Sequence, residues 1–192
     1  MGVLITVIVV AVILLIIVAF IWTTYNGMVR GRIRVKEAWA GIDVQLKRRS
    51  SLIPNLVETV KGYAAHEKDV LENVTRARAQ LDNAREGGHA AEAAKADNVL
   101  TGALRSLFAV SEAYPDLKAN QNFLELQREL TDTEDKIAYA RQFYNTNTAS
   151  YNERLAVFPN VIFAGMFNFQ PAEFYEAEAA AREDVKVSFS AT

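Results

Sequence analysis

Residues 42–67 read IDVQLKRRSSLIPNLVETVKGYAAHE, and the spacing of their apolar side chains predicts the fold. Alternating steps of four and three residues, started at Val35, meet apolar or aromatic side chains as far as Ala84, with Arg49 and Glu67 as the exceptions. Such a sustained heptad seam is typical of a coiled coil or a bundle of long helices. The stretch is therefore expected to form part of an all-helical body.

Pro54 interrupts this seam and allows two interpretations of the first long helix. Proline inside a helix removes the hydrogen bond to the carbonyl four residues back, at a cost of about 3 kcal/mol. If Ser51 caps a new helix with Pro54 in its first turn, the chain reverses there and four antiparallel helices result. If the helix only bends at Pro54, the seam runs on to Gly87–Gly88, where a helix should stop. The unbroken heptad phase favours the bend, whereas length matching favours the reversal.

Two more helices are expected after the glycine pair. Apolar residues at helical spacing predict a helix from His89 to about Glu112, and Pro115 breaks the chain just beyond it. Seven-residue steps through Phe123 and Ile137 predict a third long helix, from about Asn120 to Val157. Together these segments predict an antiparallel bundle of three to four long helices.

Polar residues at seam positions are expected to fix register and partner choice rather than to perform chemistry. Arg49 and Glu67 are charged seam positions, and Asn147 is a polar one in the last long helix. We expect Arg49 and Glu67 each to find a polar partner on another helix, because an unpaired buried charge is costly. The candidate partners are Thr133, Asn147 and Arg154.

Residues 3–22 are apolar except for Thr6 and predict a transmembrane helix. At about 1.5 Å per residue such a segment reaches roughly 30 Å, the thickness of the hydrocarbon core of a bilayer. A secretory signal is not indicated, since a basic leading region and a small-residue cleavage site are missing. Its apolar character on every face disfavours a helix of a soluble core. Trp22 and Tyr25 lie where interfacial aromatic residues are expected.

Basic residues follow the apolar segment closely. Residues 30–49 carry seven basic residues against two acids, and no charged side chain precedes Arg30. The positive-inside rule therefore predicts that the N-terminus is outside and the body is cytoplasmic. Four basic residues follow the apolar segment: Arg30, Arg32, Arg34 and Lys36. They would fix this topology, or bind anionic lipid at about 1 kcal/mol each, or do both. The net charge of −2 does not indicate a nucleic-acid partner.

The C-terminal part combines an aromatic-rich segment with an acidic one. Residues 157–175 read VFPNVIFAGMFNFQPAEFY, which is too short and too broken by proline to span a bilayer. This segment either folds back onto the bundle core or offers an apolar surface to the membrane or to a neighbouring subunit. The contact residues would be Phe158, Phe163, Phe167 and Phe169. A short acidic helix from Ala172 to about Asp184 is expected next, and then residues 185–189, either a strand that pairs with another chain or a loose tail.

The sequence offers no constellation for catalysis or metal binding. It has no cysteine and two histidines, which leaves few metal ligands. His66 and Glu67 begin the zinc pattern H-E-x-x-H, but Val70 stands where the second histidine would be. Gly27 and Gly31 have G-x-x-x-G spacing, a weak signal for dimerisation because they lie beyond the apolar segment. We therefore expect no enzyme, no cofactor and no bound metal.

Several motifs together resemble the LemA family of bacterial membrane proteins. They are the stretch at residues 42–67, VKEAW at 35–39, ARQFYN at 140–145, FP at 158–159, PAEF at 171–174 and VSF at 187–189. The resemblance covers essentially the whole chain and implies a single-pass protein of the bacterial inner membrane with a helical-bundle body in the cytoplasm. It implies no catalytic residue, and it links some relatives to the building of intracellular membrane compartments.

We expect three parts: a transmembrane anchor at residues 1–24, a cytoplasmic helical bundle at 25–157, and a Phe-rich segment with a short helix and an extended tail at 158–192. The expected function is a membrane-anchored scaffold that self-associates as a homo-oligomer and organises or shapes the lipid bilayer. The alternative is a monomeric or dimeric docking protein. It would recruit a cytoplasmic partner, such as a membrane protease or a signalling kinase, through its acidic C-terminal surface.

Overall fold

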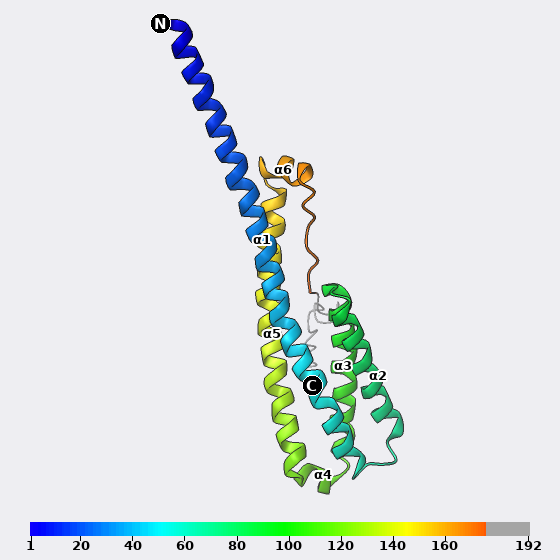
Figure 1. The fold of residues 1–192 in the computed structure, drawn as a ribbon. Coiled ribbons are helices and arrows are strands. Elements are labelled where there is room, and N and C mark those ends of the chain that lie inside the picture. The colour runs from blue at the N-terminus through cyan, green and yellow to red at the C-terminus, as the bar shows by residue number, and fades with distance from the viewer. Residues whose placement is uncertain (176–192) are drawn as a thin grey trace, which may run out of the picture. The chain divides into compact units, whose positions relative to one another are not determined.

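The computed structural model describes residues 1–175, and all regular secondary structure within that range is helical. Two helices are long and the others are shorter (Figure 1): α1 (Gly2–Lys61), α2 (Lys68–Glu86), α3 (Ala90–Ser111), α4 (Pro115–Ala119), α5 (Gln121–Ala156) and α6 (Asn160–Met166). The predicted all-α fold is confirmed, and α3 and α5 match the two later helices expected from the sequence. The short helix α4 was not predicted; Pro115 begins it, a position that suits proline because its missing N–H would have no helical partner.

The described residues form two units, each of which is treated separately below. Unit 1 comprises Met1–Gly41 and Ala140–Glu173, and unit 2 comprises Ile42–Tyr139 together with Phe174 and Tyr175. The boundaries between the units fall inside α1 and α5. The part limits expected at residues 24 and 157 concern the membrane and the Phe-rich segment, and they stay predictions.

The heptad seam supplies the core of unit 2. Seam side chains from α1, α2, α3 and α5 are at most 5 % exposed: Ile42, Leu46, Ile53, Leu56, Val60, Val74, Ala77, Leu81, Leu100, Leu107, Phe123, Leu130 and Ile137. Helices α2 and α3 form a hairpin whose turn contains Gly88 at φ +70°, a left-handed conformation that glycine adopts without steric cost. The burial of this stripe is the main source of stability in such a bundle.

The chain reverses at residues 62–67, a turn that the heptad pattern did not predict. Helix α1 ends at Lys61, and the N–H groups of Tyr63 and Ala64 both donate to the carbonyl of Val60, at 3.0 and 2.8 Å. Ala64 is buried beneath this turn. The seam keeps its phase from α1 into α2, so the periodicity concealed the break. The predicted stop at Gly87–Gly88 is correct, because α2 ends at Glu86.

Pro54 lies inside α1, which continues for seven further residues to Lys61. The alternative in which Ser51 caps a new helix at Pro54 is therefore wrong. The Ser51 hydroxyl instead donates to the carbonyl of Arg48, three residues earlier in the same helix, at 2.7 Å. The reversal that this alternative required for length matching takes place at residues 62–67.

In unit 1 the segment after α6 returns along α5 and is held by polar side chains of that helix. The Tyr151 hydroxyl donates to the Gln170 carbonyl at 3.1 Å, and the Tyr144 hydroxyl donates to the Glu173 carbonyl at 2.8 Å. The Asn152 side chain makes two hydrogen bonds with the backbone of Ala172, at 2.9 and 2.8 Å. These bonds fix the Phe-rich segment against its own chain.

The expected acidic helix is only partly within the described range. Residues 172–175 carry no regular secondary structure, so a helix does not begin at Ala172. The rest of that expected helix and the strand-like residues 185–189 lie outside the described residues.

Candidate functional site

Helix α1 is, within residues 1–175, the one helix long and apolar enough to cross a membrane, and its apolar window is not buried inside the chain. The large apolar side chains between Val3 and Val18 are 47–80 % exposed. A continuous apolar surface of this kind is unfavourable in water, where single apolar residues are common but large patches are rare. The exposed helix is consistent with a single-pass membrane protein.

Aromatic rings from the Phe-rich segment pack against α1 where the apolar segment ends. The ring centroids of Phe20 and Phe163 are 5.9 Å apart, and Tyr25 lies 5.0 Å from Phe167 and 5.7 Å from Phe169. The Arg32 guanidinium lies over the Phe169 ring, 5.3 Å from its centroid. Edge-on ring contacts and a cation–π contact each add modest stability beyond burial. Tyr25 thus packs on these rings while 40 % exposed, and Trp22 is 70 % exposed; the interfacial position expected of both stays a prediction.

The Phe-rich segment both packs and exposes apolar surface. Phe169 and Ala164 are buried, but five neighbouring side chains are 43–80 % exposed: Phe158, Val161, Ile162, Met166 and Phe167. The segment therefore folds back without hiding all of its apolar area, and contact of the exposed part with membrane or a neighbouring subunit stays a prediction. The exposed side chains belong to α6 and its flanks, next to the end of the apolar helix.

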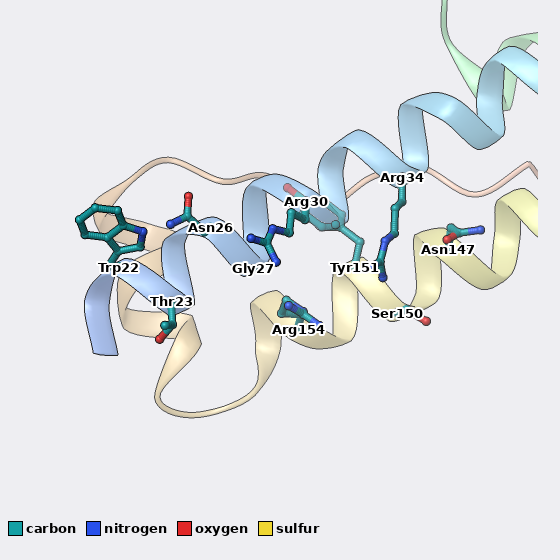
Figure 2. A pocket seen from close by; sticks show the side chains of 11 residues that line it. Trp22, Thr23, Asn26, Gly27, Arg30, Arg34, Asn147, Ser150, Tyr151 and Arg154 are labelled. Atoms are coloured by element: carbon teal, nitrogen blue, oxygen red, sulfur yellow. The ribbon is translucent and has the colours of Figure 1, made fainter. Parts of the chain in front are cut away.

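A groove of about 480 Å³ lies between α1 and α5 within unit 1 (Figure 2). Two glycines of α1 allow the close approach of α5. A Cβ on Gly27 would lie 2.6 Å from Nη1 of Arg154, and a Cβ on Gly31 would lie 2.9 Å from Cδ2 of Tyr151. The G-x-x-x-G spacing therefore serves a helix contact inside this chain, which gives the two glycines a role other than the dimerisation that the motif weakly suggested.

Three arginines line this groove without a carboxylate partner among the described residues. Arg30 and Arg34 come from α1 and Arg154 from α5, and Figure 2 shows all three along the walls of the same groove. No acidic residue is among the side chains that line it. Tyr151 also lines the groove; burial raises the pKa of its phenol, although the Arg32 cation opposes this, so the hydroxyl stays protonated at neutral pH. The groove is polar, open and positively charged.

Unit 2 contains a different kind of polar cluster, built around the seam position Arg49. Its guanidinium is bonded to Asp97 at 2.8 Å, to the Thr101 hydroxyl at 2.9 Å and to Glu134 at 3.0 Å. The Tyr175 hydroxyl donates to the second oxygen of Asp97 at 3.1 Å. The prediction that Arg49 finds a polar partner on another helix is correct, but the candidates Thr133, Asn147 and Arg154 are wrong.

Glu67 and Asn147 have other neighbours than expected. Glu67 accepts a hydrogen bond from the Tyr114 hydroxyl at 3.1 Å, in the turn between α1 and α2. The Asn147 amide donates to the Phe143 carbonyl of its own helix, and the side chain lines the groove in unit 1.

The sequence did hold a signal for Asp97, because this residue occurs three positions before Leu100 on the apolar face of α3. Lys36 is exposed and has no ion pair within the described range.

The fold and the exposed N-terminal helix define an all-helical protein with a candidate single-pass membrane anchor. The LemA family model matches residues 38–189, and the chain belongs to this family. Among curated relatives, a "Protein LemA" of Metamycoplasma hominis is 26 % identical over 164 residues, which is 85 % of this chain and 74 % of the relative. "Magnetosome protein MamQ" of Magnetospirillum gryphiswaldense is 25 % identical over 190 residues, and "Magnetosome protein MamQ 2" of Paramagnetospirillum magneticum is 26 % identical over the same length; each match covers 85 % of this chain and 70 % of the relative.

Proposed function

We propose that this protein is a membrane-anchored, self-associating scaffold that organises or shapes a lipid bilayer. The observation that carries the proposal is the apolar surface exposed by α6 and its flanks, directly beside the end of the apolar helix. Apolar area of this extent is normally covered by lipid or by another protein. A segment held at the membrane interface is placed to contact both, and one such segment per subunit would couple assembly to the membrane.

The proposed location is the bacterial inner membrane, with the N-terminus outside and the body in the cytoplasm. The basic residues that follow the apolar helix support this orientation. Unit 1 as a whole has six basic and three acidic residues, so its surface suits anionic lipid better than it suits a basic partner. Membership of the LemA family and the relatives named magnetosome proteins support membrane association of this chain.

The proposal assigns no catalytic activity to the chain. The buried side chains Arg49 and Asp97 bond to each other, and they also bond to Thr101, Glu134 and Tyr175, as in a structural cluster. The family name and the relatives' names state no reaction. A scaffold requires only the surfaces described above.

The mass of the full-length protein in mild detergent tests this proposal. Mass photometry, with electron microscopy of the same fraction, should find a large closed particle of many subunits. Replacement of three exposed residues of α6 should reduce this particle to small species, because the variant removes apolar contact area without touching the buried Phe169: Val161→Ser, Ile162→Ser and Met166→Ser.

A matched control replaces three equally exposed residues of unit 2, Val44, Val99 and Tyr139, by serine. This control should leave the particle intact. If the unaltered protein is a monomer or a dimer, the scaffold is wrong, and the docking protein that recruits a cytoplasmic partner becomes the working hypothesis. If both triple variants disrupt the particle to the same extent, α6 is not the contact surface.

A further inference from the structure

We propose that the groove between α1 and α5 in unit 1 is a binding site for a phosphate group, as carried by an anionic phospholipid headgroup or by a soluble phosphate. The site would consist of Arg30, Arg34 and Arg154, with Ser150 and Asn147 as uncharged neighbours. The inference deepens the proposed function and rests on its membrane anchoring, but it does not require self-association.

The charge of the groove is the first argument. Three guanidinium groups line one groove that contains no carboxylate, and none of the three has an ion pair with any of residues 1–175. Like charges gathered in this way repel one another, and a bound anion would remove that cost. The fixed planar fork of arginine matches the oxygens of a phosphate, often through two parallel hydrogen bonds.

The glycines are the second argument, because they make the room that the arginine from α5 occupies. Any side chain at Gly27 would meet Nη1 of Arg154, and any side chain at Gly31 would meet the Tyr151 ring. Tyr151 is itself held in place by its bond to the Gln170 carbonyl. The lack of a side chain at these two positions of α1 leaves room for Arg154. The packing of α1 against α5 therefore brings arginines from both helices into one groove.

The uncharged polar lining is the third argument. The Ser150 hydroxyl has no hydrogen-bond partner among the residues that the structure describes, and it borders the groove. The Asn147 side-chain N–H donates to the Phe143 carbonyl. The side-chain oxygen of Asn147 can then accept a hydrogen bond from a hydroxyl group, such as one of a glycerol headgroup. A site of this composition can bind the charged phosphate and the neutral part of a headgroup at once.

The position along α1 is the fourth argument. The groove begins at Trp22 and Thr23, where the apolar segment ends. Arg30 lies eight residues beyond Trp22, about 12 Å along a helix axis. Helical side chains lean toward the N-terminus, so this guanidinium reaches back toward the headgroup layer that covers the hydrocarbon core. The lipid source of the phosphate is therefore within reach of the site.

Native mass spectrometry of the full-length protein in mild detergent tests the site, since one spectrum reports both the lipids retained and the number of subunits. The probes are phosphatidylglycerol, which is anionic, phosphatidylcholine, which is zwitterionic, and inorganic phosphate as a competitor. We expect the unaltered protein to retain phosphatidylglycerol about tenfold more tightly than phosphatidylcholine. Arg154→Gln should weaken retention of phosphatidylglycerol about tenfold, because one of the three guanidinium groups that line the groove is lost.

Arg141→Gln is the matched control, because Arg141 is a second arginine of α5 in unit 1 that does not line the groove. It removes the same charge and should change lipid retention less than twofold. Gly27→Ala removes no charge and should still weaken retention, since the new methyl group displaces the Arg154 guanidinium. Circular dichroism of each variant checks that the helices are intact.

The outcomes separate the two phosphate sources and the two proposals. Arg154-dependent retention of phosphatidylglycerol that phosphate does not displace supports the lipid source, and binding of inorganic phosphate alone supports the soluble one. Equal losses for Arg154→Gln and Arg141→Gln would overturn the site, and so would binding of neither phosphatidylglycerol nor inorganic phosphate above the level of phosphatidylcholine. A monomer that retains phosphatidylglycerol through Arg154 would refute the scaffold and support the groove, whereas a large assembly without this retention would do the reverse.

Discussion

The two units of this protein treat their charged side chains in opposite ways. Within residues 1–175 the ion pairs all belong to unit 2, where Arg48, Arg49, Arg78 and Arg85 each contact at least one carboxylate. Unit 1 has six basic residues and three acidic ones, and none of them forms an ion pair within that range. The apolar residues differ too, since unit 2 buries its seam while unit 1 exposes the apolar N-terminal segment of α1 and much of α6.

This difference shows which unit supplies partners for its charged side chains from its own residues. A buried charge in a bundle must have its partners in the same chain, because water is excluded there. Exposed arginines beside an exposed apolar helix have no such requirement, and their favourable partners can come from outside the chain. Unit 2 therefore supplies the partners of its own buried charges, whereas unit 1 leaves arginines and apolar side chains available for the membrane and phosphate contacts that we propose.

The largest effect on stability is expected from Arg49→Leu. This side chain is 3 % exposed, and its removal leaves the buried Asp97 carboxylate without its cation. We expect a loss of about 3–5 kcal/mol in the free energy of unfolding. Denaturant unfolding of the full-length protein in detergent, followed by circular dichroism, measures this loss.

Two controls separate burial from charge in this experiment. Arg48→Leu breaks a pair in which both side chains are more than 40 % exposed, and its cost should stay below about 1 kcal/mol. Arg34→Leu in unit 1 should change stability by less than about 0.5 kcal/mol. The double variant Arg49→Leu with Asp97→Leu should recover much of the loss, because an apolar pair can replace a buried ion pair. Similar losses for Arg49 and Arg34 would erase the contrast between the units.

A smaller effect is expected where unit 1 packs most closely. Gly31→Ala places a methyl group against the buried Tyr151 ring, which cannot move without breaking its bond to Gln170. We expect a net loss of about 1–2 kcal/mol, after the gain in helix propensity is subtracted from the overpacking. Gly41→Ala has no heavy atom within 4 Å and should gain about 0.5–1 kcal/mol. Thermal unfolding compares the two variants, and the same sign for both would show that α5 does not pack on Gly31.

The smallest effect concerns Tyr144 and alkaline pH. Burial raises the pKa of this phenol above its ordinary value, so the folded protein holds the proton more tightly than the unfolded chain does. The resulting stability is fully present below pH about 10, the ordinary phenol pKa, and is lost as the pH rises through the folded pKa. Tyr144→Phe should cost about 1 kcal/mol at neutral pH, by loss of the bond to the Glu173 carbonyl.

Unfolding measured from pH 7 to 11 checks this prediction. The variant should lose stability less steeply on the alkaline side than the unaltered protein does. Tyr139→Phe, at an exposed tyrosine of unit 2, should leave neutral-pH stability unchanged. Identical alkaline slopes for Tyr144→Phe and the unaltered protein would mean that Tyr144 does not contribute to the pH dependence.

Several features of this protein could be predicted because they depend on residues that are close in sequence. The apolar run at residues 3–22 is a local property, and so are the helical spacing that gives α3 and α5 and the glycine stop after α2. The charge asymmetry that surrounds Arg30 is local as well. Such patterns identify helices and their buried faces without any knowledge of which helices are neighbours.

The tertiary structure alone decided the features that depend on contacts between distant residues. The reversal at residues 62–67 was hidden because the heptad phase is the same on both sides of the turn. The partners of Arg49 became visible only once α3 and α5 were placed beside α1 in unit 2. The same is true of Arg154, which meets Gly27 across more than a hundred residues of chain, so the positive groove is a product of helix packing. Periodicity specifies the face that a helix buries, whereas the identity of its partner is fixed by side-chain fit and charge between segments that the sequence keeps apart.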